Sequence, residues 1–155
     1  MFHIVLVEPE IPANTGNISR TCAITGTALH LIKPLGFSID DKHLKRAGLD
    51  YWHLLDLHIY ENLDEFLAQH GDKRLFLATT KADKHYDEVQ FQDGDFLVFG
   101  KETAGLPKHM HDRYQDTRIK IPMLDNEAAR SLNLSNSAAI LLYEALRQTG
   151  FQGLK

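Results

Sequence analysis

The stretch IPMLDNEAARSLNLSNSAAILLYEAL, Ile121–Leu146, contains the clearest helix signal in the chain. From Ser135 to Gln148, apolar residues recur at helical spacing and place one apolar face on a predicted helix, formed by Leu134, Ala138, Leu141, Leu142 and Ala145. Polar residues crowd its start, namely Ser131, Asn133, Ser135, Asn136 and Ser137. A helix cap needs only one of them. The surplus indicates either turn hydrogen bonding or a polar site at the helix N-terminus, and the residues alone leave both open.

Outward from this stretch, predicted strands and helices alternate along the whole chain. Apolar runs predict strands at 3–7, 28–32, 55–60, 74–80, 95–100 and 118–121. Helices are predicted at 14–25, 40–47, 62–70 and 135–148, with Asn14 as the N-cap of the first and Gly26 as its stop. Near-continuous apolar strands separated by helices are typical of a parallel sheet covered on both faces. We therefore predict one α/β domain over residues 1–155, since no linker or repeat interrupts the pattern.

Composition excludes several classes of protein. With 155 residues, 43% of them hydrophobic and 25% charged, the chain can bury a core and is not disordered. No apolar run is long enough for a membrane span and no basic leader precedes the first strand, so we expect a cytoplasmic protein. A single cysteine, Cys22, excludes an internal disulfide and is predicted to be a small buried hydrophobe. The net charge of −4 means that any nucleic-acid binding depends on a local basic patch.

Two further segments stand at the carboxyl ends of predicted strands, where parallel sheets bind ligands. EPEIPANTGNISR, Glu8–Arg20, leads into a helix whose N-terminus and Arg20 suit an anion, although a capped helix with a surface arginine explains it as well. LVFGKETAGLP, Leu97–Pro107, is neither a dinucleotide fingerprint nor a phosphate loop, and by itself reads as a strand-to-helix turn. The HxH pair of His109 and His111 has no further clustered ligands, so both are predicted to be surface histidines.

Together the three segments resemble the three motifs of the SPOUT class of RNA methyltransferases, in the SpoU branch that methylates ribose 2′-hydroxyls. Motif one resembles NxGxxxR and is carried by Asn14, Gly16 and Arg20. Motif two resembles FGxExxGLP and is carried by Gly100–Pro107, and motif three runs from Ile121 to Ala145. The resemblance covers essentially the whole chain in the family's order and spacing. It implies an α/β fold whose C-terminal part is threaded as a deep trefoil knot.

Further segments resemble the minimal branch of this family, which lacks a separate RNA-binding domain. They are the EPEIPANTGNI opening, DKHLKRAGLDYW at Asp41–Trp52 and TTK at Thr79–Lys81. Members of that branch transfer a methyl group from S-adenosylmethionine to the wobble nucleotide, cytidine or uridine, of certain leucine tRNAs. The resemblance therefore implies S-adenosylmethionine as cofactor, no metal, the anticodon stem-loop of tRNA as partner, and a homodimer.

The resemblance also assigns residues. The cofactor pocket is expected to be lined by Ala78, Gly100, Ile121, Met123, Ser131 and Leu132. The catalytic group is expected to comprise Arg20, Asn14, Glu102, Ser131 and Asn133. RNA contacts are expected from Arg20, Lys42, Lys45 and Arg46. Because an arginine stays protonated, we expect Arg20 to pair with phosphate and stabilise the developing alkoxide rather than act as a simple base.

Alternatives remain from other classes. A non-enzymatic RNA-binding module of the same fold would lack motif residues, and none is missing here. A methyltransferase for another RNA is disfavoured only by the whole-chain resemblance. A flavodoxin-like or Rossmann-like cofactor protein would need a phosphate loop after the first strand, which Pro9, Pro12 and the lone Gly16 suit poorly.

Overall fold

The computed structural model describes residues 1–40, 49–126, 128 and 131–155, and these form one parallel sheet with helices on both faces. The strands are β1 (His3–Val7), β2 (Ala28–Ile32), β3 (Leu57–Tyr60), β4 (Leu75–Ala78), β5 (Lys84–His85), β6 (Phe96–Phe99) and β7 (Arg118–Lys120). Their order across the sheet is β3-β2-β1-β6-β4-β7-β5, and every pair of neighbours is parallel. The predicted α/β class is confirmed.

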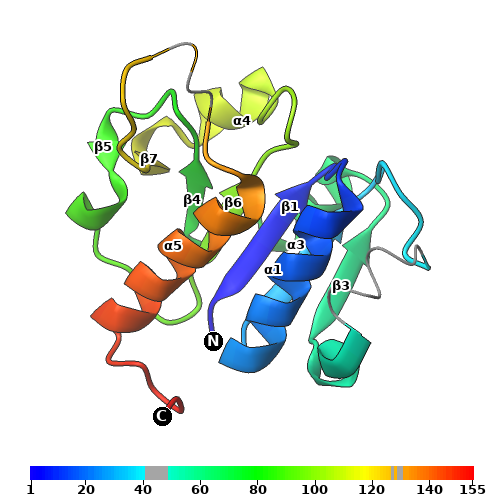
Figure 1. Ribbon diagram of the computed structural model, residues 1–155. Helices are drawn as coiled ribbons and strands as arrows, with labels where there is room; N and C mark the ends of the chain where they lie inside the picture. Colours follow the sequence, from blue (N-terminus) through cyan, green and yellow to red (C-terminus); the bar gives the residue numbers. More distant parts are fainter. Residues whose placement is uncertain (41–48, 127, 129–130) are drawn as a thin grey trace.

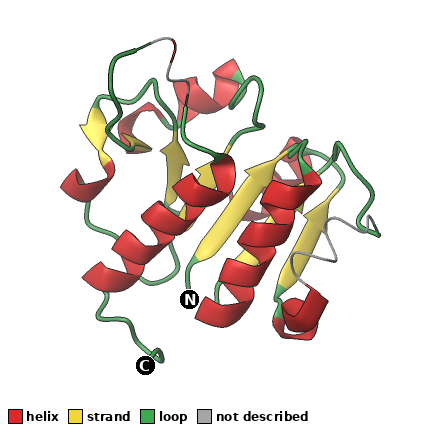
Figure 2. Cartoon of the chain, viewed as in Figure 1, coloured by secondary structure: helices red, strands yellow, loops and turns green. Residues whose placement is uncertain are grey.

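Helices cover the sheet in two layers. The α-helices of the described residues are α1 (Pro12–Thr25), α3 (Leu63–His70), α4 (Lys108–Arg113) and α5 (Leu134–Gln148). The same part of the chain has the 3₁₀ helices η1 (Leu49–Leu54), η2 (Tyr86–Glu88) and η3 (Gln115–Thr117). Helices α1 and α5 lie side by side on one face, as Figure 1 shows, and bury Ile18, Cys22 and Leu141 against it. On the other face Phe66 of α3 and Met110 of α4 enter a second core cluster. Figure 2 shows the resulting arrangement of helix, sheet and helix.

Two inner strands of the sheet are buried over their whole length. All residues of β2 and β6 are buried, as expected for strands covered on both faces. The six predicted strands all form, most of them trimmed by one or two residues at an end. The additional strand β5 has only two residues, which is too short for an apolar pattern to predict a strand there.

Helices α3 and α5 agree with the predicted ranges to within one residue, α4 was not among the predicted ranges, and α1 differs at its start. Helix α1 ends at Gly26, whose φ of +68° suits glycine, as predicted. It begins at Pro12, however, with Ile11 at the N-cap position and no side-chain cap. The prediction that Asn14 is the N-cap is therefore wrong, and Asn14 lies inside the first turn. The predicted helix at 40–47 falls almost wholly outside the described residues.

Candidate active site

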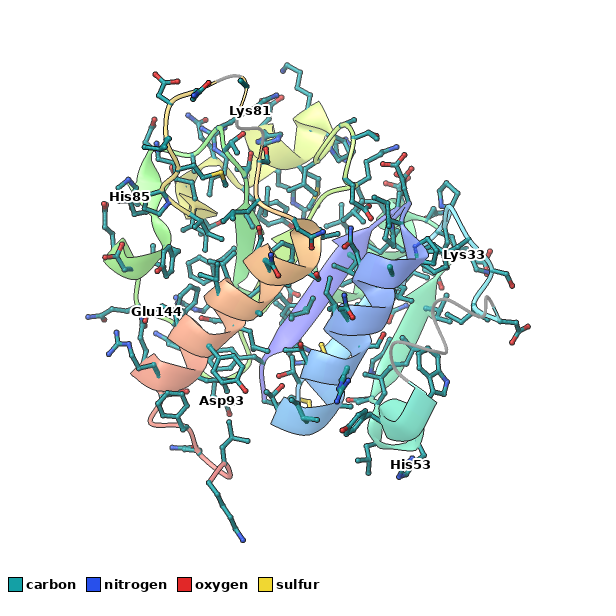
Figure 3. The ribbon with its side chains drawn as sticks, in the orientation of Figure 1. Lys33, His53, Lys81, His85, Asp93 and Glu144 are labelled. Carbon is teal, nitrogen blue, oxygen red and sulfur yellow. The ribbon has the colours of Figure 1, made fainter. Side chains whose placement is uncertain are left out.

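A cavity of about 740 Å³ lies beyond the carboxyl ends of β4, β6 and β7. This volume is in the usual range for sites of small molecules and cofactors. Three loops and the start of α5 enclose it, contributing residues 78–81, 100–106, 121–123 and 131–134. Lys81, labelled in Figure 3, marks this end of the molecule, and Asp93 is labelled at the opposite end. The parallel sheet thus brings together loops that are far apart in sequence, as expected for this fold class.

All six residues predicted to form the cofactor pocket line this cavity, namely Ala78, Gly100, Ile121, Met123, Ser131 and Leu132. Four residues of the predicted catalytic group had no cofactor assignment, and three of them line the cavity as well, namely Asn14, Glu102 and Asn133. The wall combines apolar side chains with backbone groups and a few polar side chains, the composition typical of a nucleoside-binding site.

Gly100 occupies a position that has no room for a side chain. A Cβ built there would lie 2.7 Å from the Gly105 Cα and closer still to the Gly105 carbonyl carbon and the Leu106 nitrogen. The turn that follows is closed by a hydrogen bond from the Gly105 N–H to the Lys101 carbonyl at 2.9 Å, and Gly105 has a φ of +70°. The glycines of motif two are therefore required by the tight turn itself.

Glu102 reaches from this turn to the start of α1. Its carboxylate accepts hydrogen bonds from the backbone N–H groups of Glu10 and Ile11, each at 2.9 Å, and from the Asn14 side-chain amide at 3.2 Å. A carboxylate at a helix N-terminus satisfies free N–H groups and is favoured by the helix dipole. The geometry therefore places Glu102 and Asn14 in the role of joining motif one to motif two.

The polar run before α5 combines both interpretations left open by the sequence. Asn133 is the N-cap, since its Oδ1 accepts hydrogen bonds from the Ser135 N–H at 2.8 Å and from the Ser135 hydroxyl at 2.6 Å. Ser131, Asn133 and Ser137 also line the cavity. The run is thus partly a capping structure and partly a polar wall.

Arg20 is absent from the cavity lining that the described residues form. It lies on α1 and its guanidinium carbon sits 4.8 Å from the centre of the Tyr51 ring, with Nη2 donating a hydrogen bond of 3.3 Å to the Tyr51 hydroxyl. A single chain therefore does not bring Arg20 to the cavity, unlike Asn14 at the start of the same helix. The other predicted RNA contacts, Lys42, Lys45 and Arg46, lie outside the described residues.

Two functional candidates escaped the sequence reasoning. His111 was predicted to be a surface residue, which is wrong: it is 9% exposed, lines the cavity, and its Nδ1 has no hydrogen-bond partner among the described residues. Burial lowers the pKa of His111, and Lys81 and Arg118 lower it further. Lys81 adds a cation to the cavity lining. Lys81 stands in the TTK segment that resembles the family, but no role was predicted for it, and no local signal indicates that His111 is buried.

Metal-binding clusters and membrane-spanning helices are both absent from the described part of the chain. No group of three or more His, Cys, Asp or Glu side chains within it is arranged to hold a metal ion. Nor does any helix there combine the length and apolar character needed to cross a membrane. Cys22 is fully buried, and burial raises the pKa of its thiol, so it behaves as the predicted apolar residue.

The known proteins that this chain resembles in sequence and structure are RNA methyltransferases. The chain matches the model of the SpoU rRNA methylase family over residues 1–143. It is 54% identical over 154 residues to the tRNA (cytidine(34)-2'-O)-methyltransferase of Methylovorus glucosotrophus, covering 99% of each chain. It superposes with a TM-score of 0.89 on a structure described as giving insights into the 2-OH methylation of C/U34 on tRNA, at 43% identity and 96% coverage of each chain.

A third relative was solved with a cofactor. The SpoU methyltransferase AviRb from Streptomyces viridochromogenes, in complex with AdoMet, matches with a TM-score of 0.79 and 25% identity. That match covers 95% of this chain and 57% of the AviRb chain. Fold, motif geometry and the family match over most of its length lead to one conclusion: this chain belongs to the SpoU methylase family.

Proposed function

We propose that this protein transfers a methyl group from S-adenosylmethionine to the ribose 2′-hydroxyl of nucleotide 34, cytidine or uridine, in leucine tRNAs. One observation carries the proposal: the three loops that bear the family motifs close around a single cavity of nucleoside size. The 54% identity to a tRNA (cytidine(34)-2'-O)-methyltransferase over nearly the full length of both chains supports the position and the base.

The residues of the cavity fit S-adenosylmethionine. Gly100 lies in the cavity wall and allows the motif-two turn to pack closely on its own backbone, so a glycine there shapes a wall against which a ligand can lie. Ala78, Ile121 and Leu132 provide apolar walls for a nucleobase. The AdoMet complex of AviRb supports the same choice of cofactor. When bound, the cofactor supplies an activated methyl group, so that the protein has mainly to position the acceptor and exclude water.

The acceptor needs help because a ribose hydroxyl is a weak nucleophile until its proton is removed or shared. An arginine side chain is effectively always charged in proteins, and we propose that Arg20 pairs with an RNA phosphate and stabilises negative charge on the attacking 2′-oxygen. Since Arg20 lies away from the cavity of its own chain, we propose that it serves the cavity of the partner subunit in a homodimer. Helices α1 and α5 lie side by side, and we propose that they form the interface of this dimer.

The finer structural proposals follow the same reasoning. We propose that residues 1–155 form a single methyltransferase domain, with the segment around the cavity threaded as a deep trefoil knot. Ile121, Met123 and residues 131–134 line the same cavity as residues 78–81 and 100–106, which is compatible with such threading. The anticodon stem-loop is then held by the dimer surface, with Lys42, Lys45 and Arg46 as its basic contacts. A cytoplasmic location suits this substrate.

The decisive experiment is mass-spectrometric mapping of 2′-O-methylated nucleosides in tRNA from cells with and without this protein. We expect loss of the methyl group at position 34 of leucine tRNAs alone, and its return when purified protein and S-adenosylmethionine are added to the hypomethylated tRNA. Loss at another RNA would redirect the assignment to a different substrate. Unchanged methylation together with intact RNA binding would favour a non-enzymatic RNA-binding module.

A further inference from the structure

Two loops that are 92 positions apart in the sequence, at Glu10 and Glu102, hold each other by reciprocal carboxylate contacts. As described above, Glu102 accepts hydrogen bonds from the backbone N–H groups of Glu10 and Ile11. In return, Glu10 Oε1 accepts hydrogen bonds from the Thr103 N–H at 3.0 Å and the Thr103 hydroxyl at 2.7 Å. We call Glu10, Glu102 and Thr103 the clasp. Each loop thus supplies a carboxylate to the backbone of the other, so neither can shift without breaking contacts on both sides.

Two further contacts hold the loops that carry the clasp. The turn that carries Glu102 and Thr103 is closed by the hydrogen bond from Gly105 to Lys101. Lys101 also forms an ion pair with Glu8 at 3.5 Å, which adds a further contact between the same two loops. The hydrogen bonds from Thr103 lower the pKa of Glu10, so its carboxylate is ionised and acts only as an acceptor. Such charge-assisted hydrogen bonds are stronger than neutral ones.

The position of the clasp connects the two halves of the site. Thr103, Glu102 and Ile11 line the cavity, so one side of the clasp belongs to the proposed cofactor loop. Glu10 stands immediately before α1, the helix that carries Asn14 and Arg20. Helix α1 has no side-chain cap of its own, and the clasp is what fixes its first turn. Displacement of this turn would move both motif-one residues relative to the cofactor.

We infer that Glu10 is a positioning residue, acting through Thr103 to hold the motif-one loop against the motif-two loop in the geometry needed for methyl transfer. The inference rests on the proposed function. It differs from a role in stability alone, because misplacement of a reacting group by about 1 Å can cost two orders of magnitude in rate while the fold survives. Glu10 contacts neither the substrate nor the cofactor in this proposal, so it orients rather than reacts.

The test compares Glu10→Ala with the conservative Glu10→Gln, with Thr103→Val, and with Glu88→Ala as control. Glu88 is a glutamate outside the cavity whose carboxylate lies 3.8 Å from His85. We expect Glu10→Ala to lower kcat by about tenfold, while KM for tRNA and Kd for S-adenosylhomocysteine change less than about threefold. Glu10→Gln keeps an oxygen acceptor for Thr103 and should stay within about threefold of the native kcat.

Thr103→Val removes the hydroxyl and leaves the N–H, so its loss of kcat should be smaller than that of Glu10→Ala. The double variant should be no worse than Glu10→Ala alone, because both changes break the same pair. Hydrogen exchange provides a readout independent of catalysis: amides of residues 10–15 should exchange about tenfold faster in Glu10→Ala than in the native protein or in Glu88→Ala.

Native exchange rates and native kcat in Glu10→Ala would overturn the inference. So would a loss of kcat matched by an equal loss of folded protein, or a double variant whose effect is the sum of the single ones. If the native protein neither binds S-adenosylhomocysteine nor methylates tRNA, the proposed function fails by itself. The exchange rates of residues 10–15 would still decide, in that case, whether the clasp holds the two loops together.

Discussion

Replacement of Gly100 by alanine isolates the geometry of the motif-two turn. The added Cβ would lie 2.7 Å from the Gly105 Cα, whereas ordinary van der Waals contacts begin at 3.4 Å, and two further backbone atoms lie nearer still. Backbone cannot rotate away as a side chain does, so the turn must move by about 1 Å. Since this turn forms part of the cavity wall, we expect affinity for S-adenosylhomocysteine to fall about 100-fold, equivalent to about 2.7 kcal/mol.

Isothermal titration with S-adenosylhomocysteine measures this loss directly, and thermal unfolding measures the accompanying loss of stability. Gly26→Ala is the matched control. Gly26 has a φ of +68° with open space around its Cβ position, so alanine there is strained by about 1 kcal/mol but lies far from the motif-two turn. It should be destabilised and still bind normally. Native affinity in a folded Gly100→Ala protein would refute the assignment of this turn to the cofactor.

Three other predictions concern the arginine and the histidines. Arg20→Ala should lower turnover about 100-fold with unchanged cofactor affinity, and Arg20→Lys should restore little of that turnover. If the site is shared between subunits, mixed dimers of Arg20→Ala and Gly100→Ala subunits should methylate tRNA faster than either variant alone. Tyr51→Leu should lower turnover about tenfold without loss of stability, since it removes the ring and hydroxyl that orient Arg20; native turnover would exclude this role. Burial, and to a smaller extent the neighbouring histidines, lowers the pKa of His30 to about 3, whereas a histidine in the unfolded chain has a pKa near 6.5. As the pH falls below 6.5, the unfolded state therefore binds a proton before the folded state does, and the folded state loses stability. Urea unfolding should therefore show about 2–3 kcal/mol less stability at pH 4.5 than at pH 7 from His30 alone, and His30→Phe should flatten this dependence whereas His109→Gln should not.

The α/β class could be predicted from the residues, and the resemblance to a known family supplied the candidate site residues. Buried apolar runs and the helical repeat before Leu146 depend on local side-chain patterns, so strands and helices appear where the residues predict them. The six predicted cofactor residues are separated by up to 54 positions, from Ala78 to Leu132, yet all line one cavity. The resemblance to the family supplied these six residues, and they meet because the carboxyl ends of β4, β6 and β7 and the segment before α5 lie together.

Only the tertiary structure decided how the loops are held and which polar groups are buried. Helix α1 begins at Pro12, a residue type favoured at the first helical position, and Glu102, more than 90 positions away, accepts the N–H groups of Glu10 and Ile11 just before it. Pro12 was a local signal for this start, whereas no local pattern reports the contact with Glu102, and the N-cap was misassigned to Asn14. Burial of His111 likewise follows from the packing of α4 beside the cavity. Non-local hydrogen bonds and burial depend on which elements meet in space, and this is set by the order of strands rather than by neighbours in sequence.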